Sequence, residues 1–76
     1  MDRKVEQVFA NVFQLKIEDI QDEFTPNDIH GWDSLGHLSL ISAIEQQFNT
    51  TLNMEDAIGI QSVKDVKRIL NGKGLL

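Results

Sequence analysis

The sequence predicts an all-α protein: a small four-helix bundle of three longer helices and one short third helix, with a long loop between helices one and two. Three stretches carry apolar residues at helical spacing, and no stretch shows a strand-like alternation long enough to form a sheet. The chain has 76 residues, no cysteine and 41% hydrophobic residues. One domain over residues 1–76, held by an apolar core without disulfides, is therefore expected.

The first helix is expected from about residue 3 to about residue 14. Its apolar side chains recur every three or four positions and so share one face; they are Val5, Val8, Phe9, Val12 and Phe13. Asp2 is a candidate N-cap, because an aspartate accepts hydrogen bonds from the free amides of a first helical turn.

Residues 15–33 are expected to form a long loop. Large apolar residues are spread among acids, with a turn at Thr25-Pro26-Asn27 and a helix breaker at Gly31. The apolar residues are Ile17, Ile20, Phe24, Ile29 and Trp32. Loops this long are usually functional or disordered, and the regular supply of large apolar residues predicts that this one packs over the bundle.

The second helix is expected from Ser34 to Phe48, ending at Asn49, within a segment that reads GWDSLGHLSLISAIEQQF over residues 31–48. One continuous face is assigned to the core: His37, Leu40, Ile41, Ile44 and Phe48. A second stripe, of Leu35, Leu38, Ser42 and Glu45, is apolar only near Ser34. Packing under the preceding loop and exposure to a partner both fit Leu35, whereas exposure is favoured for Leu38.

Two shorter patterns complete the bundle. Asn53 can cap a short third helix that reaches about Ile58 and stops at Gly59. Ser62 and Asp65 resemble a capping box at the start of a fourth helix. Its apolar face comprises Val63, Val66, Ile69 and Leu70, it ends at Asn71-Gly72, and residues 71–76 are expected to be a frayed tail.

The charge distribution excludes some classes of partner. The net charge is −5, and residues 17–33 hold six acids and neither lysine nor arginine. The one basic cluster, over residues 64–73, is short and interrupted by Asp65, so nucleic acid is not an expected partner. An acidic surface instead favours basic patches on proteins. No apolar run is long enough to cross a membrane and no signal peptide is evident, so the cytoplasm is expected.

Ser34 is the residue with two contrasting interpretations. Serine is among the best N-caps, and Asp33 beside it suits the positive end of the helix dipole. The start of a helix also favours a bound anion, so a phosphodiester on Ser34 would be well placed.

Catalytic and metal sites fit the sequence poorly. Asp33-Ser34-Leu35 resembles part of the Gly-Asp-Ser-Leu esterase motif, but Trp32 replaces the glycine and no Asp-x-x-His follows. The hydrolase elbow Gly-x-Ser-x-Gly is also absent. His30, Asp33 and His37 form only a weak metal-ligand pattern, so no metal is expected.

Asp33-Ser34-Leu35, followed by an amphipathic helix that ends Ile44-Glu45-Gln46-Gln47-Phe48, resembles the acyl and peptidyl carrier proteins over essentially the whole chain. The resemblance implies that Ser34 is esterified by 4′-phosphopantetheine, transferred from coenzyme A by a separate phosphopantetheinyl transferase. It implies a non-enzymatic monomer whose arm holds an acyl or aminoacyl thioester. A cargo-loading ligase or acyltransferase and downstream biosynthetic enzymes would be its partners.

The resemblance also implies a docking surface made of Asp33, Leu35, Leu38 and Ser42. Fatty-acid-synthesis carriers have acids where this chain has Gly36, Ser39 and Gln46, which favours a specialised biosynthetic pathway over housekeeping fatty acid synthesis. Two alternatives stay open: a fatty-acid-synthesis carrier, and a helical interaction module without a prosthetic group in which Ser34 is only a cap. In fatty-acid carriers the acyl chain can lie between the helices; here Leu40, Ile41, Ile44 and Ile58 are assigned to the core rather than to such a cavity.

Overall fold

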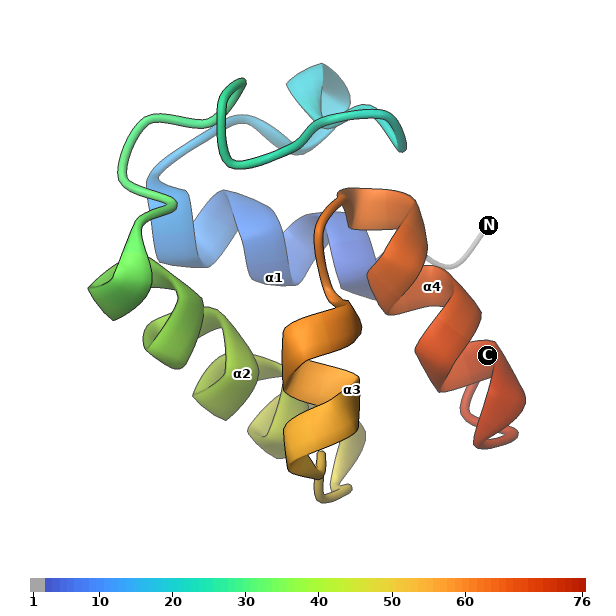
Figure 1. The fold of residues 1–76 in the computed structure, drawn as a ribbon. Coiled ribbons are helices and arrows are strands. Elements are labelled where there is room, and N and C mark those ends of the chain that lie inside the picture. Colours follow the sequence, from blue (N-terminus) through green and yellow to red (C-terminus); the bar gives the residue numbers. More distant parts are fainter. Residues whose placement is uncertain (1–2) are drawn as a thin grey trace.

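The computed structural model describes residues 3–76, so the predicted Asp2 cap lies outside the described part of the chain. Its helices are α1 (Lys4–Phe13), a 3-10 turn η1 (Ile17–Asp19), α2 (Ser34–Phe48), α3 (Met54–Gly59) and α4 (Val63–Gly72). The segment between α1 and α2 arches over one end of the bundle, and α3 crosses in front of α2 (Figure 1). Residues 3–76 contain no strand, and the predicted all-α four-helix bundle is confirmed.

Local signals account for the helix ends. α1 is one residue shorter at each end than predicted and ends where Gln14 adopts a left-handed backbone, with φ of 59°. α2 has the predicted bounds, and Asn49 ends it in the same conformation, with φ of 50°. α3 has a full capping box between Asn53 and Asp56, which satisfies amides that would otherwise lack a partner.

The core is built from α1, α2 and α4, from the long loop, and from the connections on either side of α3. Its buried members are Val5, Val8, Phe9, Ile20, Ile29, Trp32, Leu40, Ile44, Phe48, Leu52, Ile60, Val63, Val66 and Leu70. The predicted core face of α2 is confirmed for Leu40, Ile44 and Phe48, with Ile41 partly buried against them. The assignment of Ile58 to the core is wrong: this side chain is 66% exposed, because the six-residue α3 turns it outward to solvent.

The long loop packs over the bundle, as predicted, and α4 holds it there. Ile29 and Trp32 are buried, and the first amides of α4 donate to the loop, from Val63 to the Phe24 carbonyl (3.0 Å) and from Lys64 to that of Asp22 (2.9 Å). These donors are among the four that a helix start cannot satisfy internally. The loop therefore arrives at Ser34 from an anchored position.

An ion pair cluster joins three parts of the chain. The Lys67 ammonium lies 2.6 Å from Glu6 of α1 and 2.7 Å from Asp22 of the loop. Partial burial disfavours the charged ammonium, but its hydrogen bonds to Asp22 and Glu6 more than offset this and raise the pKa of Lys67 above its ordinary value.

A second ion pair joins α3 to the end of α4. Lys73 lies 3.2 Å from Asp56; its hydrogen bond, and then that from the Asn53 amide, hold the pKa of Asp56 below its ordinary value. α4 continues through Gly72, into the segment 71–76 that the sequence predicts to fray, and the Leu75 amide donates to the Leu70 carbonyl (2.9 Å). Over residues 3–76, no helix combines the length and the hydropathy needed to cross a bilayer.

Candidate functional site

Ser34 is the first residue of α2, and Asp33, not Ser34, is its N-cap. Asp33 has an extended backbone (φ −106°, ψ −162°), and its carboxylate accepts the Gly36 amide at 2.9 Å. The interpretation of Ser34 as a cap is therefore wrong. Its side chain is exposed, and its hydroxyl makes no hydrogen bond to any residue of the described chain. The hydroxyl is free for chemistry.

A close backbone approach fixes the start of α2. Gly31, in the left-handed region at φ of 92°, turns the loop so that its carbonyl lies against Gly36. A Cβ at position 36 would overlap the Gly31 carbonyl oxygen and lie 3.1 Å from the Phe13 ring. Gly36 therefore has a packing reason to be glycine, which the sequence did not reveal.

Trp32 and His37 link the loop, α2 and α3. The Trp32 indole N–H donates to His37 Nδ1 at 2.9 Å, and His37 Nε2 lies 2.8 Å from the Ala57 carbonyl oxygen of α3. One neutral tautomer, with its proton on Nε2, satisfies both bonds. The predicted core position of His37 is thus half-buried and hydrogen-bonded, and it connects elements that flank Ser34.

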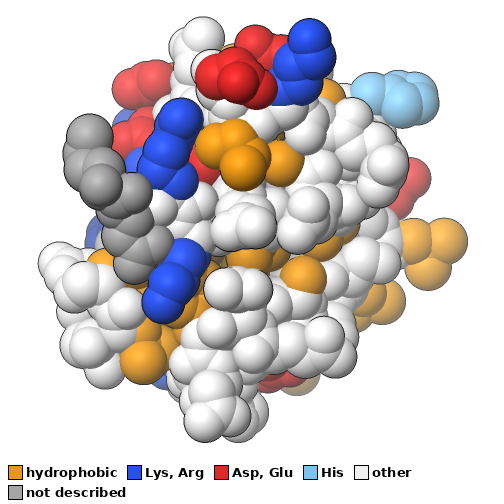
Figure 2. All heavy atoms as spheres, turned by 180° about the vertical axis from the view of Figure 1, so that it is seen from behind, with side chains coloured by type: hydrophobic (Ala, Val, Ile, Leu, Met, Phe, Trp, Pro, Cys, Tyr) orange, Lys and Arg blue, Asp and Glu red, His pale blue; other side chains and the backbone are white. Residues whose placement is uncertain are grey.

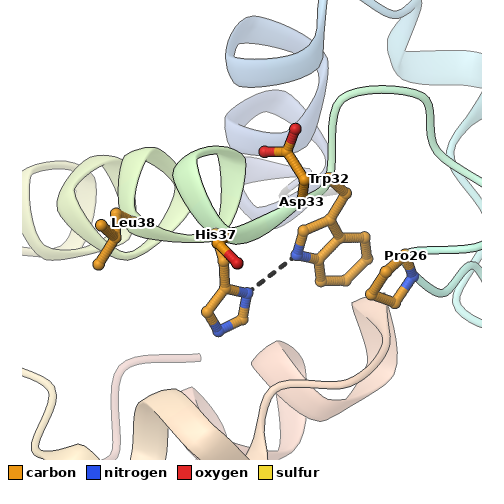
Figure 3. Close-up of a pocket in the computed structure, with 6 residues that line it drawn as sticks. Pro26, Trp32, Asp33, His37 and Leu38 are labelled. Carbon is orange, nitrogen blue, oxygen red and sulfur yellow. Dashed lines mark hydrogen bonds between the residues drawn. The ribbon is translucent and has the colours of Figure 1, made fainter.

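Trp32 and His37 help to line a pocket beside Ser34 that is open to solvent. Its volume is about 460 Å³, and it is lined by Pro26, Trp32, Asp33, Ser34, His37 and Leu38. Figure 3 shows Trp32 and His37 joined by their hydrogen bond, with Pro26 on one side and Leu38 on the other. A group attached to Ser34 thus has an apolar surface next to it.

The predicted docking residues all lie on the surface. Asp33, Leu35, Leu38 and Ser42 are exposed, with exposed fractions of 76% for Leu35 and 66% for Leu38. Figure 2 shows a hydrophobic side chain projecting at the edge formed by α2, and acidic and basic side chains gathered at the loop end. Large apolar side chains left in water on one helix mark a candidate contact surface.

Glu45, the fourth member of the same stripe, has a different role. Its carboxylate accepts the Leu52 amide at 2.9 Å and is partly buried. It therefore supports the connection between α2 and α3, and Asp33 is the exposed acid among the predicted docking residues.

The three candidate metal ligands do not come together. Among residues 3–76, no group of three histidine, cysteine or acidic side chains gathers closely enough to hold an ion. His30 is exposed on the loop, while both ring nitrogens of His37 are engaged by Trp32 and Ala57.

Comparison with known proteins identifies the family of the chain. A family model described as "Phosphopantetheine attachment site" matches residues 3–70. The chain belongs to the phosphopantetheine-binding carrier family. Similar carriers include the acyl carrier protein of Buchnera aphidicola subsp. Schizaphis graminum, 27% identical over 73 residues that span 96% of this chain and 92% of the relative. The acyl carrier protein of Syntrophobacter fumaroxidans is 35% identical over 66 residues, spanning 87% of this chain and 82% of the relative.

Membership of the carrier family means that the protein is a carrier and not a catalyst, with covalently attached 4′-phosphopantetheine. The described serines differ in their fitness for that bond. Ser62 is buried and its hydroxyl accepts the Asp65 amide, whereas Ser39 and Ser42 are exposed within α2. Ser34 combines an exposed, unengaged hydroxyl with a helix start and an adjoining pocket, so the carrier has a serine that fits the group.

Proposed function

We propose that Ser34 is the attachment residue for 4′-phosphopantetheine and that the protein delivers cargo held on this arm to biosynthetic enzymes. The observation that carries the proposal is the exposed Ser34 hydroxyl at the first position of α2, with capping supplied by Asp33. When bound, the arm ends in a thiol that carries an acyl or aminoacyl group as a thioester. A flexible tether raises the effective concentration of that group at a partner's active site.

The proposed docking surface comprises Asp33, Leu35, Leu38 and Ser42, on the same side of α2 as the attachment point. Exposed apolar side chains beside an acid suit a partner with an apolar patch and a basic rim. The proposed partners at this surface are a phosphopantetheinyl transferase, a cargo-loading ligase or acyltransferase, and the enzymes that use the cargo.

A specialised pathway is proposed rather than housekeeping fatty acid synthesis. The only acid within α2 is Glu45, and its carboxylate is held by the Leu52 amide. The docking face of α2 therefore offers a partner little negative charge beyond Asp33. The protein is proposed to act as a monomer in the cytoplasm.

The attachment proposal predicts a defined mass change. Incubation of the apo protein with coenzyme A, Mg²⁺ and a broad-specificity phosphopantetheinyl transferase is expected to add the mass of one phosphopantetheine. Fragmentation of the product by tandem mass spectrometry should place that mass on Ser34. A competent transferase that modifies a control carrier but leaves this chain unchanged would contradict the proposal, as would modification at Ser39 or Ser42.

The docking proposal predicts a kinetic effect for Leu35→Ala. Loss of an interfacial leucine removes apolar contact worth about 1.5 kcal/mol or more, so the transferase's kcat/KM is expected to fall about tenfold. The melting temperature should stay within about 2 °C, because little buried area is lost. Met54→Ala is the matched control, since Met54 on α3 is 78% exposed against 76% for Leu35. Equal effects of the two variants would show that docking does not depend on this face of α2.

A further inference from the structure

The pocket beside Ser34 has a preformed aromatic wall. The ring planes of Trp32 and His37 differ by 11°, their centroids are 6.2 Å apart, and their nitrogens are hydrogen-bonded at 2.9 Å. A hydrogen bond between ring nitrogens lies in the plane of both rings, so the two rings lie edge to edge and form one nearly flat surface. This wall spans the loop and α2.

The packing behind the wall keeps it in place. Trp32 is 4% exposed, so only a narrow part of its ring reaches the pocket and the half-buried His37 supplies more of the wall. Trp32 contacts the Phe9 ring edge-on, with centroids 5.3 Å apart, and the Phe13 ring at 5.9 Å. His37 is held from its other nitrogen by Ala57 at 2.8 Å. A ligand therefore meets this wall without having to order it, which lowers the cost of binding.

The exposed rim of the pocket has a polar part, Asp33 and Ser34, and an apolar part that is not used by the core. Pro26 of the loop and Leu38 of α2 are exposed and line opposite sides of the wall. Leu38, which is 66% exposed, therefore belongs both to the proposed docking surface and to this pocket.

We propose that the pocket is a seat for the prosthetic arm, that is, a weak binding site that the arm occupies when no partner is bound, with the arm's dimethyl-substituted carbon on the wall between Trp32 and Leu38. This inference rests on the attachment at Ser34 proposed above. Ser34 itself lines the pocket, and the dimethyl carbon is the branched apolar group that lies closest along the arm to the phosphate.

Tethering makes a weak seat sufficient. A short flexible linker holds its end at an effective concentration in the millimolar range, so a contact with a Kd of about 1 mM or below is enough for the arm to occupy the pocket. The seat is open to solvent and its lining is largely apolar, so the arm is free to leave when a partner offers better contacts. Trp32 and His37 are then positioning residues, because they shape the surface on which the arm rests.

The single tryptophan of the chain makes the seat observable. Apo and arm-bearing protein, the latter verified by mass, are compared by NMR with ¹⁵N labelling, which gives one indole N–H signal. Arm attachment is expected to shift that signal and to produce nuclear Overhauser contacts between the arm's methyl protons and the Trp32 ring. The two methyl signals should move upfield from their positions in free coenzyme A, owing to the ring current of the indole.

A pair of variants tests the seat itself. Leu38→Ala is expected to return the methyl signals at least halfway to their free positions, whereas Ile58→Ala, at an equally exposed α3 position (66%), should leave them unchanged. Methyl signals that coincide with those of free coenzyme A, with no contact to Trp32, in a protein shown by mass to bear the arm would overturn the seat and leave attachment intact. Failure to gain the mass at all would overturn both proposals.

Discussion

Ser34→Ala is expected to abolish phosphopantetheine attachment completely and to leave the melting temperature within about 2 °C of the wild type. The variant removes the one atom to which the arm would be joined, and that atom makes no hydrogen bond within the described chain. If Ser34 were the cap of α2, the same change would cost about 0.5–2 kcal/mol. In a domain of this size, that loss lowers the melting temperature by about 4–8 °C for each kcal/mol. Intact mass and thermal unfolding followed by circular dichroism measure the two effects.

Substitutions at Asp33 and Ser39 provide the controls for this prediction. Asp33→Ala removes the acceptor of the Gly36 amide and should lower stability by about 1 kcal/mol. Asp33→Asn keeps a good cap and removes the charge, so any slower transfer in that variant reports on docking and not on the fold. Ser39→Ala should accept the arm normally. Mass gain by Ser34→Ala, or destabilisation equal to that of Asp33→Ala, would refute the assignment of roles to the two residues.

The helices could be predicted because their signals are local. The spacing of Val5, Val8 and Phe9 predicts the buried face of α1. Asn53 and Ser62 are good N-cap residues and predict the helices that follow them. The same periodicity favours exposure of Leu38 but leaves Leu35 open between packing under the loop and exposure, and the structure places both in solvent. Such features depend on neighbours within about one helical turn.

The sequence alone could not show which residue is the N-cap of α2. Asp33 and Ser34 are adjacent and both are good caps, so propensity does not distinguish them. The decision comes from the extended backbone of Asp33, which leaves Ser34 as the first helical residue.

The site's other features depend on residues far apart in the chain. The bond from His37 to Ala57 joins positions 20 residues apart, and nothing in the sequence pairs them. The apolar side chain of Ile58 predicts a core position, but α3 is too short for periodicity to indicate which of its faces is buried.

Gly36→Ala is expected to destabilise the protein strongly, against the direction that helix propensity predicts. Alanine is about 1 kcal/mol better than glycine inside a helix, so an unobstructed position would gain stability. Here the added methyl group overlaps the Gly31 carbonyl. The Phe13 ring lies 3.1 Å from the methyl carbon, so the methyl group cannot move towards that ring to relieve the overlap. Overpacking of this kind costs about 1–3 kcal/mol, which corresponds to a melting temperature lower by about 4–24 °C.

Gly72→Ala is the matched control for that prediction. Gly72 is also helical, but nothing lies within 4 Å of the position of an added Cβ. The same chemical change should therefore be neutral or slightly stabilising there, and the opposite signs isolate the contact with Gly31 from helix propensity. If Gly36→Ala melts at or above the wild-type temperature, the loop does not press on α2. In that case Ser34 would owe its position to the Asp33 cap and the Trp32–His37 link alone. If it melts much lower, the backbone approach of Gly31 is part of what holds the attachment residue at the start of its helix.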